Sequence, residues 1–271
     1  MIIMKCKKVR QSNIELLRIM AISGVVFLHY CNTTTGGALS YLKDSSFNRL
    51  ILYFFLSLFA CSVDLFLIIS GYFLADAMER SISKPVELVV QVVLFSELTY
   101  IVDSVLSNSS ITFSIIVSKI IPANYFVILY CVVYLLSPFL NHLIDNLTEK
   151  SFQSLIILSF VLFCVYPTAI DVLSELKGES IIGLSTIGAY GSQWGYSVVN
   201  FVFMYLIGAY IRRSNNKIKE WSIKRLLLLL CGCIIVIIFW AKINDVTGYL
   251  TERSAWEYCN PVIVFEAAIV F

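Results

Sequence analysis

Eight long apolar runs restrict the fold of this chain more than any other feature. An α-helix rises about 1.5 Å per residue, so roughly 20 apolar residues cross a bilayer core of about 30 Å. Within that core, only helices and closed barrels satisfy every backbone amide and carbonyl. The runs are 14–31, 51–75, 86–106, 122–143, 152–172, 196–212, 224–241 and 258–271. We therefore expect an all-α, polytopic transmembrane helical bundle with about eight spans.

The composition agrees with a membrane protein. Hydrophobic residues make up 59% of the 271 residues and charged residues 14%, and the mean hydropathy is +0.84. Soluble domains contain about half apolar and about a quarter charged residues. The net charge of +2 is too small to indicate a nucleic-acid partner, and we expect none. The eight cysteines lie mostly inside apolar runs without ligand spacing, so we expect no metal site.

Basic residues in the short loops indicate the orientation, because they collect on the cytoplasmic side of a membrane. The loop between Arg212 and Arg225 is the most basic of them, and its place in the alternation puts the N-terminus in the cytoplasm. The last run, 258–271, reaches only roughly 21 Å as a helix. We expect a single membrane domain over residues 1–271 whose last span is incomplete, so that the chain is C-terminally truncated.

Arg18 and His29 stand at opposite ends of the first apolar run. Eleven residues of helix advance roughly 16 Å and complete about three turns, so both side chains return to nearly the same face. Ionisable side chains inside a membrane segment are costly and usually mark a pathway or an active site. We therefore expect the guanidinium and the imidazole to face one sheltered groove, with Glu15 on the same face.

Each of these residues also has a structural interpretation. Ser12 and Glu15 match a capping box, and Glu15 is three residues from Arg18, which suits an ion pair. Arg18 could extend to the inner interface, where a long basic side chain reaches water. His29 could donate a hydrogen bond to a neighbouring helix, or it could act as a general base near neutral pH.

The second apolar run contributes three supporting candidates. Asp64 lies deep in this run and needs a cationic or hydrogen-bonding partner, for which His29 is our candidate. Such a carboxylate would hold the imidazole in one tautomer. Ser70 and Gly71 offer a small hydroxyl and a close approach between helices.

The blocks at residues 13–18 with His29, and at residues 63–72, resemble the membrane acyltransferase-3 family. Residues 130–141 and 203–212 are similar to later blocks of its surface-polysaccharide O-acyltransferase branch. The resemblance implies about ten spans in a bacterial plasma membrane, and an enzyme that moves an acyl group, usually acetyl from acetyl-CoA, onto a sugar hydroxyl. Acetyl-CoA is then a substrate, and no permanently bound cofactor is expected.

The resemblance also implies roles for individual residues. The equivalents of Arg18 and His29 are the functional pair, with the histidine as the catalytic residue. A basic motif follows the second span in many members, and here Arg80 and Lys84 occupy that place, spaced more widely than the usual arginines. We expect Arg18, Arg80 and Lys84 to meet the anionic acyl-CoA, and His29 to meet the glycan or glycolipid acceptor.

Two other functions remain open at this point. A transporter or flippase would use the acidic residues of the apolar runs as a relay, including Glu97 and Glu266, although the chain shows no paired halves. A truncated, inactive pseudoenzyme would instead assist a neighbouring glycan pathway. The sequence leaves the oligomeric state undetermined.

Overall fold

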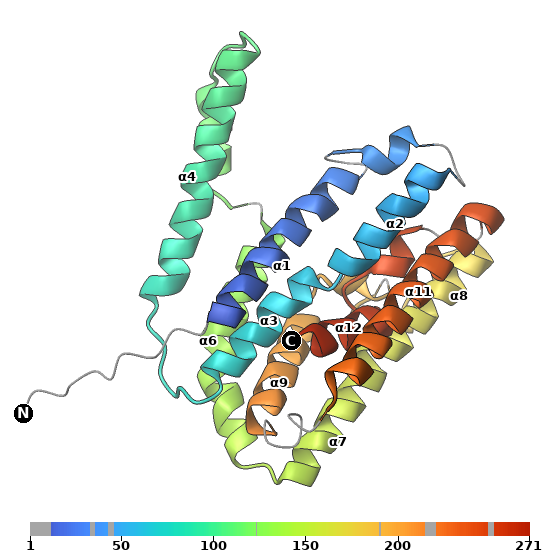
Figure 1. The fold of residues 1–271 in the computed structure, drawn as a ribbon. Helices are drawn as coiled ribbons and strands as arrows, with labels where there is room; N and C mark the ends of the chain where they lie inside the picture. The colour runs from blue at the N-terminus through green and yellow to red at the C-terminus, as the bar shows by residue number, and fades with distance from the viewer. Residues whose placement is uncertain are drawn as a thin grey trace, which may run out of the picture.

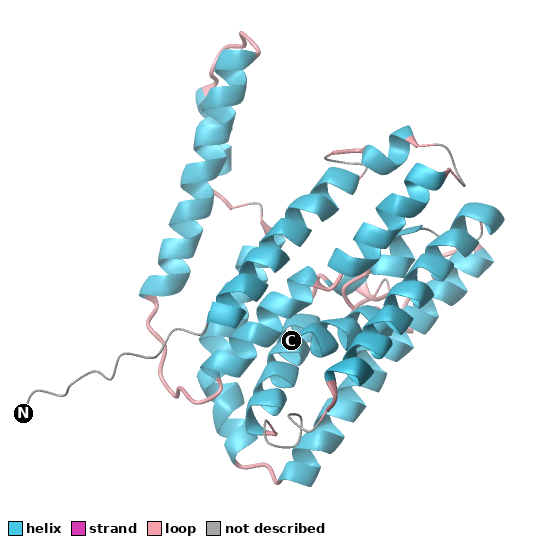
Figure 2. Ribbon diagram, in the orientation of Figure 1, coloured by secondary structure: helices cyan, strands magenta, loops and turns pink. Residues whose placement is uncertain are grey.

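The computed structural model describes residues 12–32, 36–42, 46–122, 124–189, 191–214, 221–248 and 252–271. Every regular element in these ranges is helical (Figure 2), which confirms the all-α fold. Short helices lie between the long ones: η1 (Ala38–Tyr41), α5 (Phe113–Lys119), η3 (Gln193–Gly195) and η4 (Glu252–Trp256).

Six helical segments are long and apolar enough to cross a membrane within the described residues. Two of them are composite, because α2 runs on into α3 and α7 runs through a π-turn into α8. Their bounds are α1 Ser12–Cys31, α2 Phe47–Phe59 with α3 Ser62–Leu74, α4 Ser83–Leu106, α6 Tyr125–Asp145, α7 Glu149–Phe160 with η2 Val161–Val165 and α8 Tyr166–Lys177, and α11 Ile223–Thr247.

The other two expected spans also form helices, but shorter ones. The run 196–212 becomes α9 (Val198–Arg213), which has 16 residues, and the run from 258 becomes α12 (Pro261–Val270), which has 10. Both helices are largely buried in the bundle. They therefore act as core helices of a membrane domain more than as lipid-facing ones.

The centre of the bundle is the crossing of α3 and α9, which two glycines make possible. A Cβ on Gly71 would lie 2.1 Å from the Tyr205 carbonyl oxygen, and a Cβ on Gly208 would lie 2.1 Å from the Ile68 carbonyl oxygen. Because neither glycine has a Cβ, the two backbones pack directly on each other. Phe201, Phe203 and Met204 fill the surrounding core.

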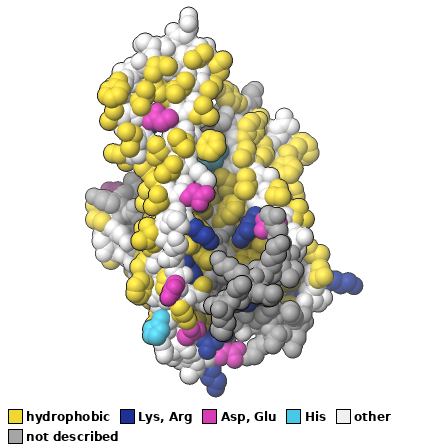
Figure 3. Space-filling model, turned by 90° about the vertical axis from the view of Figure 1, so that its left-hand side faces the viewer, with side chains coloured by type: hydrophobic (Ala, Val, Ile, Leu, Met, Phe, Trp, Pro, Cys, Tyr) yellow, Lys and Arg dark blue, Asp and Glu magenta, His cyan; other side chains and the backbone are white. Residues whose placement is uncertain are grey.

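The helix α4 stands beside the bundle rather than within it (Figure 1). Its main contacts are with α6 and α5, and little of its surface is covered by protein. Its exposed apolar side chains are those that lipid would contact. On the face drawn in Figure 3, hydrophobic side chains cover the upper half and the basic side chains gather in the lower half. The turns after α3 and α6 lie at that lower end of the molecule (Figure 1).

Candidate active site

Arg18 is placed by α1 against the end of α3. Its Nη1 donates to the Glu15 carboxylate at 3.1 Å, so the expected pair one turn apart is formed. Its guanidinium carbon lies 5.6 Å from the centre of the Phe73 ring, a cation–π distance. The Arg18 side chain is 39% exposed. It is therefore oriented by an acid and a ring while it keeps a free surface for a ligand.

Arg18 lines a cavity of about 210 Å³ formed by residues of α1, α3, α4 and α6. Two cations line it, Arg18 from α1 and Lys84 from α4, together with Ser70 of α3. The lining residues are Arg18, Ser70, Phe73, Leu74, Lys84, Pro85, Leu88, Tyr130, Cys131 and Tyr134. A small chamber with apolar walls and two positive charges suits part of an amphipathic anion.

Arg80 lies next to this cavity, but its guanidinium is hydrogen-bonded to other residues of the protein. Its Nε donates to the Ser137 hydroxyl at 2.7 Å, and its Nη2 donates to the Leu74 carbonyl at 2.7 Å. Its guanidinium also lies 5.7 Å from the ring centre of Tyr134. Arg80 therefore ties the end of α3 to α6 and holds a cavity wall, whereas Lys84 lines the cavity itself.

His29 lies in the last turn of α1, and its side chain is exposed. It does not line the cavity that Arg18 lines, so the expected shared groove is not seen there. Ile14, Ala21, Gly24 and Cys31 form the buried face of α1. At 100° per residue that face lies roughly a quarter-turn from the Arg18–His29 stripe. The stripe therefore runs along the edge of the packed face, and its Arg18 end lines the cavity.

Asp64 does not pair with His29, so this expectation is wrong. Its Oδ1 accepts from the Asn200 amide at 3.4 Å, and its Oδ2 has no hydrogen-bond partner among the described residues. Asp64 is fully buried at the start of α3, whereas His29 lies on the exposed edge of α1. Ser70 lines the cavity, and its hydroxyl donates to the Phe66 carbonyl oxygen at 2.8 Å. Gly71 lies at the α3–α9 crossing.

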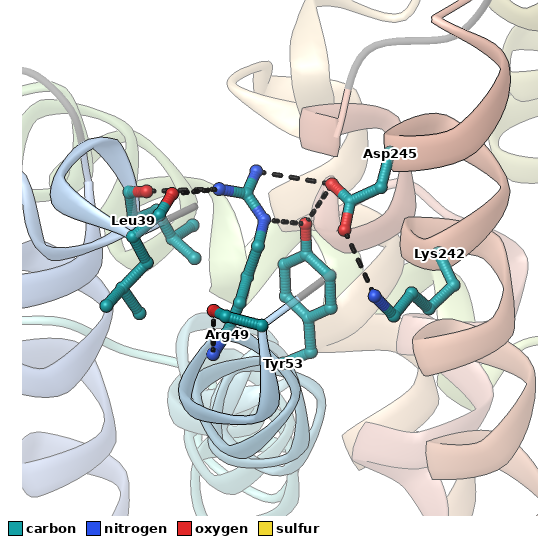
Figure 4. Close-up of polar contacts among 7 residues, drawn as sticks. Leu39, Arg49, Tyr53, Lys242 and Asp245 are labelled. Atoms are coloured by element: carbon teal, nitrogen blue, oxygen red, sulfur yellow. Dashed lines mark hydrogen bonds and ion pairs between the residues drawn. The ribbon is translucent and has the colours of Figure 1, made fainter. Parts of the chain in front are cut away.

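A second polar cluster is centred on Arg49 (Figure 4) and contacts the segment that is hydrogen-bonded to His29, so it lies at the same end of the bundle as His29. Arg49 is 6% exposed and pairs with Asp245 of α11 at 3.2 Å, while Lys242 lies 3.6 Å from the other oxygen of Asp245. Tyr53 joins the pair through its hydroxyl. Nothing in the sequence pattern singles out these residues, although Arg49 and Asp245 both flank apolar runs, where an ion pair is tolerated.

The aromatic wall of the cavity was likewise not predicted from the sequence. Tyr130 and Tyr134 of α6 lie one turn apart and both line it, together with Phe73. The block at residues 130–141 was the available signal, but aromatic residues in an apolar run are typical of any membrane helix. Among the described residues, no group of three or more His, Cys, Asp or Glu side chains is placed to hold a metal ion.

Comparison with known proteins gives a match to one family. No curated protein and no solved structure matches the chain. Residues 11–271 match the acyltransferase-3 family model, which is described as an acyltransferase domain. The match covers nearly the whole chain, including α1 with Arg18 and His29 and all four walls of the cavity. Together with its apolar helices, this shows that the chain belongs to the membrane acyltransferase-3 family.

Proposed function

We propose that the protein is a bacterial plasma-membrane O-acyltransferase that moves an acetyl group from acetyl-CoA to a sugar hydroxyl. The acceptor is a cell-surface polysaccharide or its lipid-linked precursor. The observation that carries the proposal is the cavity in which Arg18 and Lys84 meet beside an aromatic wall, in a chain with an acyltransferase domain.

The donor is assigned to the Arg18 end. The phosphates of CoA are anionic, and Arg18 and Lys84 supply positive charge with several donors for them. The cavity of about 210 Å³ is smaller than the roughly 300–1,000 Å³ typical of ligand sites, so it would hold one portion of the donor. The basic lower end of the bundle suits the cytoplasm, where acyl-CoA is found and where the N-terminus is proposed to lie.

The transfer step is assigned to His29. Its neutral imidazole would take the proton of the acceptor hydroxyl as the oxygen attacks the thioester carbonyl. The carbon–sulfur bond then breaks, and the CoA thiolate leaves and is protonated. His29 lies roughly 16 Å along the helix from Arg18, so the extended arm of the donor would connect the two ends.

Cys131 provides a direct test of donor binding, because its thiol lines the cavity. We expect acetyl-CoA to slow the alkylation of Cys131 by N-ethylmaleimide in membranes, as measured by mass spectrometry. Cys231, on the lipid-facing surface of α11 and outside the cavity, is the control whose alkylation by the membrane-permeant maleimide acetyl-CoA should not change. Protection should be lost in Arg18→Ala. Equal alkylation of Cys131 with and without acetyl-CoA would contradict the donor assignment.

The reaction itself is tested by mass analysis of the cell-surface glycan. We expect the wild type to add about 42 Da per acetylated sugar, and His29→Ala to add none while its amount in the membrane is unchanged, because the general base is absent. Full acetylation by His29→Ala would refute the role of His29. Unmodified glycan in the wild type as well would instead favour the pseudoenzyme.

A further inference from the structure

We propose that Arg49 is a positioning residue for His29 and acts through residues 36–42, the segment that follows the end of α1. This inference rests on the proposed function only in so far as His29 is the base of the transfer step. Its structural part, that Arg49 fixes the surroundings of the imidazole, can be measured without any acyl transfer.

The segment 36–42 is bonded directly to the turn that carries His29. The Gly36 amide donates to the His29 carbonyl oxygen at 3.0 Å, and the Gly37 amide donates to the Asn32 carbonyl oxygen at 2.7 Å. These bonds satisfy carbonyl oxygens that have no donor within the helix at its C-terminal end. A Cβ on Gly36 would lie 2.1 Å from the Tyr30 carbonyl oxygen, so the contact requires glycine. A displacement of residues 36–42 would therefore also displace the backbone of His29.

Arg49 holds the other end of the same segment. Its Nη1 donates to the Leu39 carbonyl oxygen at 3.1 Å and to the Leu42 carbonyl oxygen at 3.2 Å (Figure 4). Leu39 belongs to η1 and is itself buried. One guanidinium nitrogen thus ties the start and the end of η1 to α2.

Arg49 is in turn fixed by the bundle. Its Nε donates to the Tyr53 hydroxyl at 2.8 Å, and its Nη2 pairs with Asp245 of α11 at 3.2 Å. Tyr53 is fully buried and packs against Trp256, with ring centres 5.6 Å apart. The planar guanidinium therefore connects the segment after His29 to two long helices, a geometry that a lysine ammonium cannot reproduce.

The position of the Arg49 contacts allows an effect on the transfer step to be distinguished from an effect on donor binding. Arg49 acts at the His29 end of α1, whereas Arg18 and Lys84 line the cavity at the opposite end. Loss of the Arg49 contacts should therefore lower kcat and leave the KM for acetyl-CoA unchanged. A displacement of about 1 Å at a catalytic group can reduce the rate by about 100-fold.

The experiment compares Arg49→Lys with Lys242→Gln in membranes that contain equal amounts of folded protein. Lys242 belongs to the same cluster, 3.6 Å from Asp245, but within the described part of the chain it makes no hydrogen bond or ion pair with η1, so it is the matched control. The first readout is the rate at which diethyl pyrocarbonate modifies His29, followed by mass spectrometry. The second is kcat and KM for acetyl-CoA. We expect Arg49→Lys to change the modification rate by at least about twofold and to lower kcat by about 10-fold to 100-fold, and Lys242→Gln to change neither.

Gly36→Ala is a second variant that disturbs the same segment without touching the ion pair, and it covers the case in which Arg49→Lys fails to fold. It should reproduce the change in His29 modification. Wild-type modification of His29 in either folded variant would overturn the proposal. If Arg49→Lys alters His29 modification but wild-type protein transfers no acetyl group, the positioning role stands and the proposed function fails.

Discussion

At the scale of single residues, Asp64 shows how the partner of a buried group decides its role. A carboxylate inside a membrane span is expected to face a cation. Asp64 instead accepts a hydrogen bond from the Asn200 amide. Within the part of the chain that the structure describes, the Asp64 Oδ2 and the Asn200 Oδ1 have no hydrogen-bond partner. The residue is therefore part of the α3–α9 interface and not of the His29 site.

Asp64→Asn should consequently leave the acyl transfer rate within about twofold of wild type, because Asp64 touches no proposed reacting group. The new amide can also donate to the Asn200 Oδ1, so we expect the stability to rise by about 1 kcal/mol or remain unchanged. Thermal unfolding in detergent and acetyl transfer measure the two effects. Asn200→Leu is the contrasting variant, since it leaves Asp64 buried without its donor and should cost about 1–3 kcal/mol. A large loss of activity in a stable Asp64→Asn protein would contradict this interpretation.

The sequence indicates which residues matter at this scale better than it indicates what they touch. The ion pair of Glu15 with Arg18 is local, three positions apart on one helix, and its spacing predicts it. The partner of Asp64 lies 136 positions further along the chain. No periodicity within α3 carries information about that contact, because it depends on how α9 crosses α3.

At the scale of elements, the α3–α9 crossing depends on the absence of two Cβ atoms. Gly71 and Gly208 let each backbone lie on the other, and a Cβ at either position would meet a backbone carbonyl. A carbonyl in a helix cannot move aside as the end of a flexible side chain can. The crossing distance is therefore set by these two residues.

We expect Gly71→Ala and Gly208→Ala to destabilise the protein by about 1–3 kcal/mol, because they overpack a close helix crossing. Gly232→Ala in α11 is the matched control, since a Cβ there meets nothing within 4 Å. Its alanine should raise stability by up to about 1 kcal/mol through helix propensity. Thermal unfolding in one detergent compares all three variants. Equal melting temperatures for the three would refute this account of the crossing.

The helices themselves were largely predictable, and their lengths were less so. All eight apolar runs become helices, because hydrocarbon requires internally bonded backbone. The runs that form α9 and α12 gave no sign of lying in the core of the bundle, since a buried helix and a lipid-facing helix are both apolar on every side. Whether such a helix faces lipid or protein is decided by its neighbours.

At the scale of the whole molecule, the two ends of the bundle differ in chemistry. Arg18, Arg80 and Lys84 surround the cavity at one end, together with the basic end of α9. His29 and the Arg49 cluster occupy the other end. An enzyme that takes a donor from one side of a membrane and meets an acceptor nearer the other would use this polarity.

The polarity predicts the topology. We expect Asn146→Cys, in the turn between α6 and α7, to be protected from a membrane-impermeant maleimide in intact spheroplasts. Ser109→Cys, between α4 and α5, should react, because the loop after α4 lies on the opposite side. Permeabilised spheroplasts, in which both positions should react, are the control. Labelling of Asn146→Cys alone in intact spheroplasts would reverse the assigned orientation.

The position of α4 beside the bundle makes the cavity that Arg18 and Lys84 line sensitive to bilayer thickness. Its apolar run, 86–106, measures roughly 32 Å as a helix, close to the roughly 30 Å of a typical hydrocarbon core. In a bilayer of another thickness such a helix would tilt to fit. Lys84, Pro85 and Leu88 at its foot form one cavity wall, so lipids with longer or shorter chains would reshape the chamber without any change in the protein sequence.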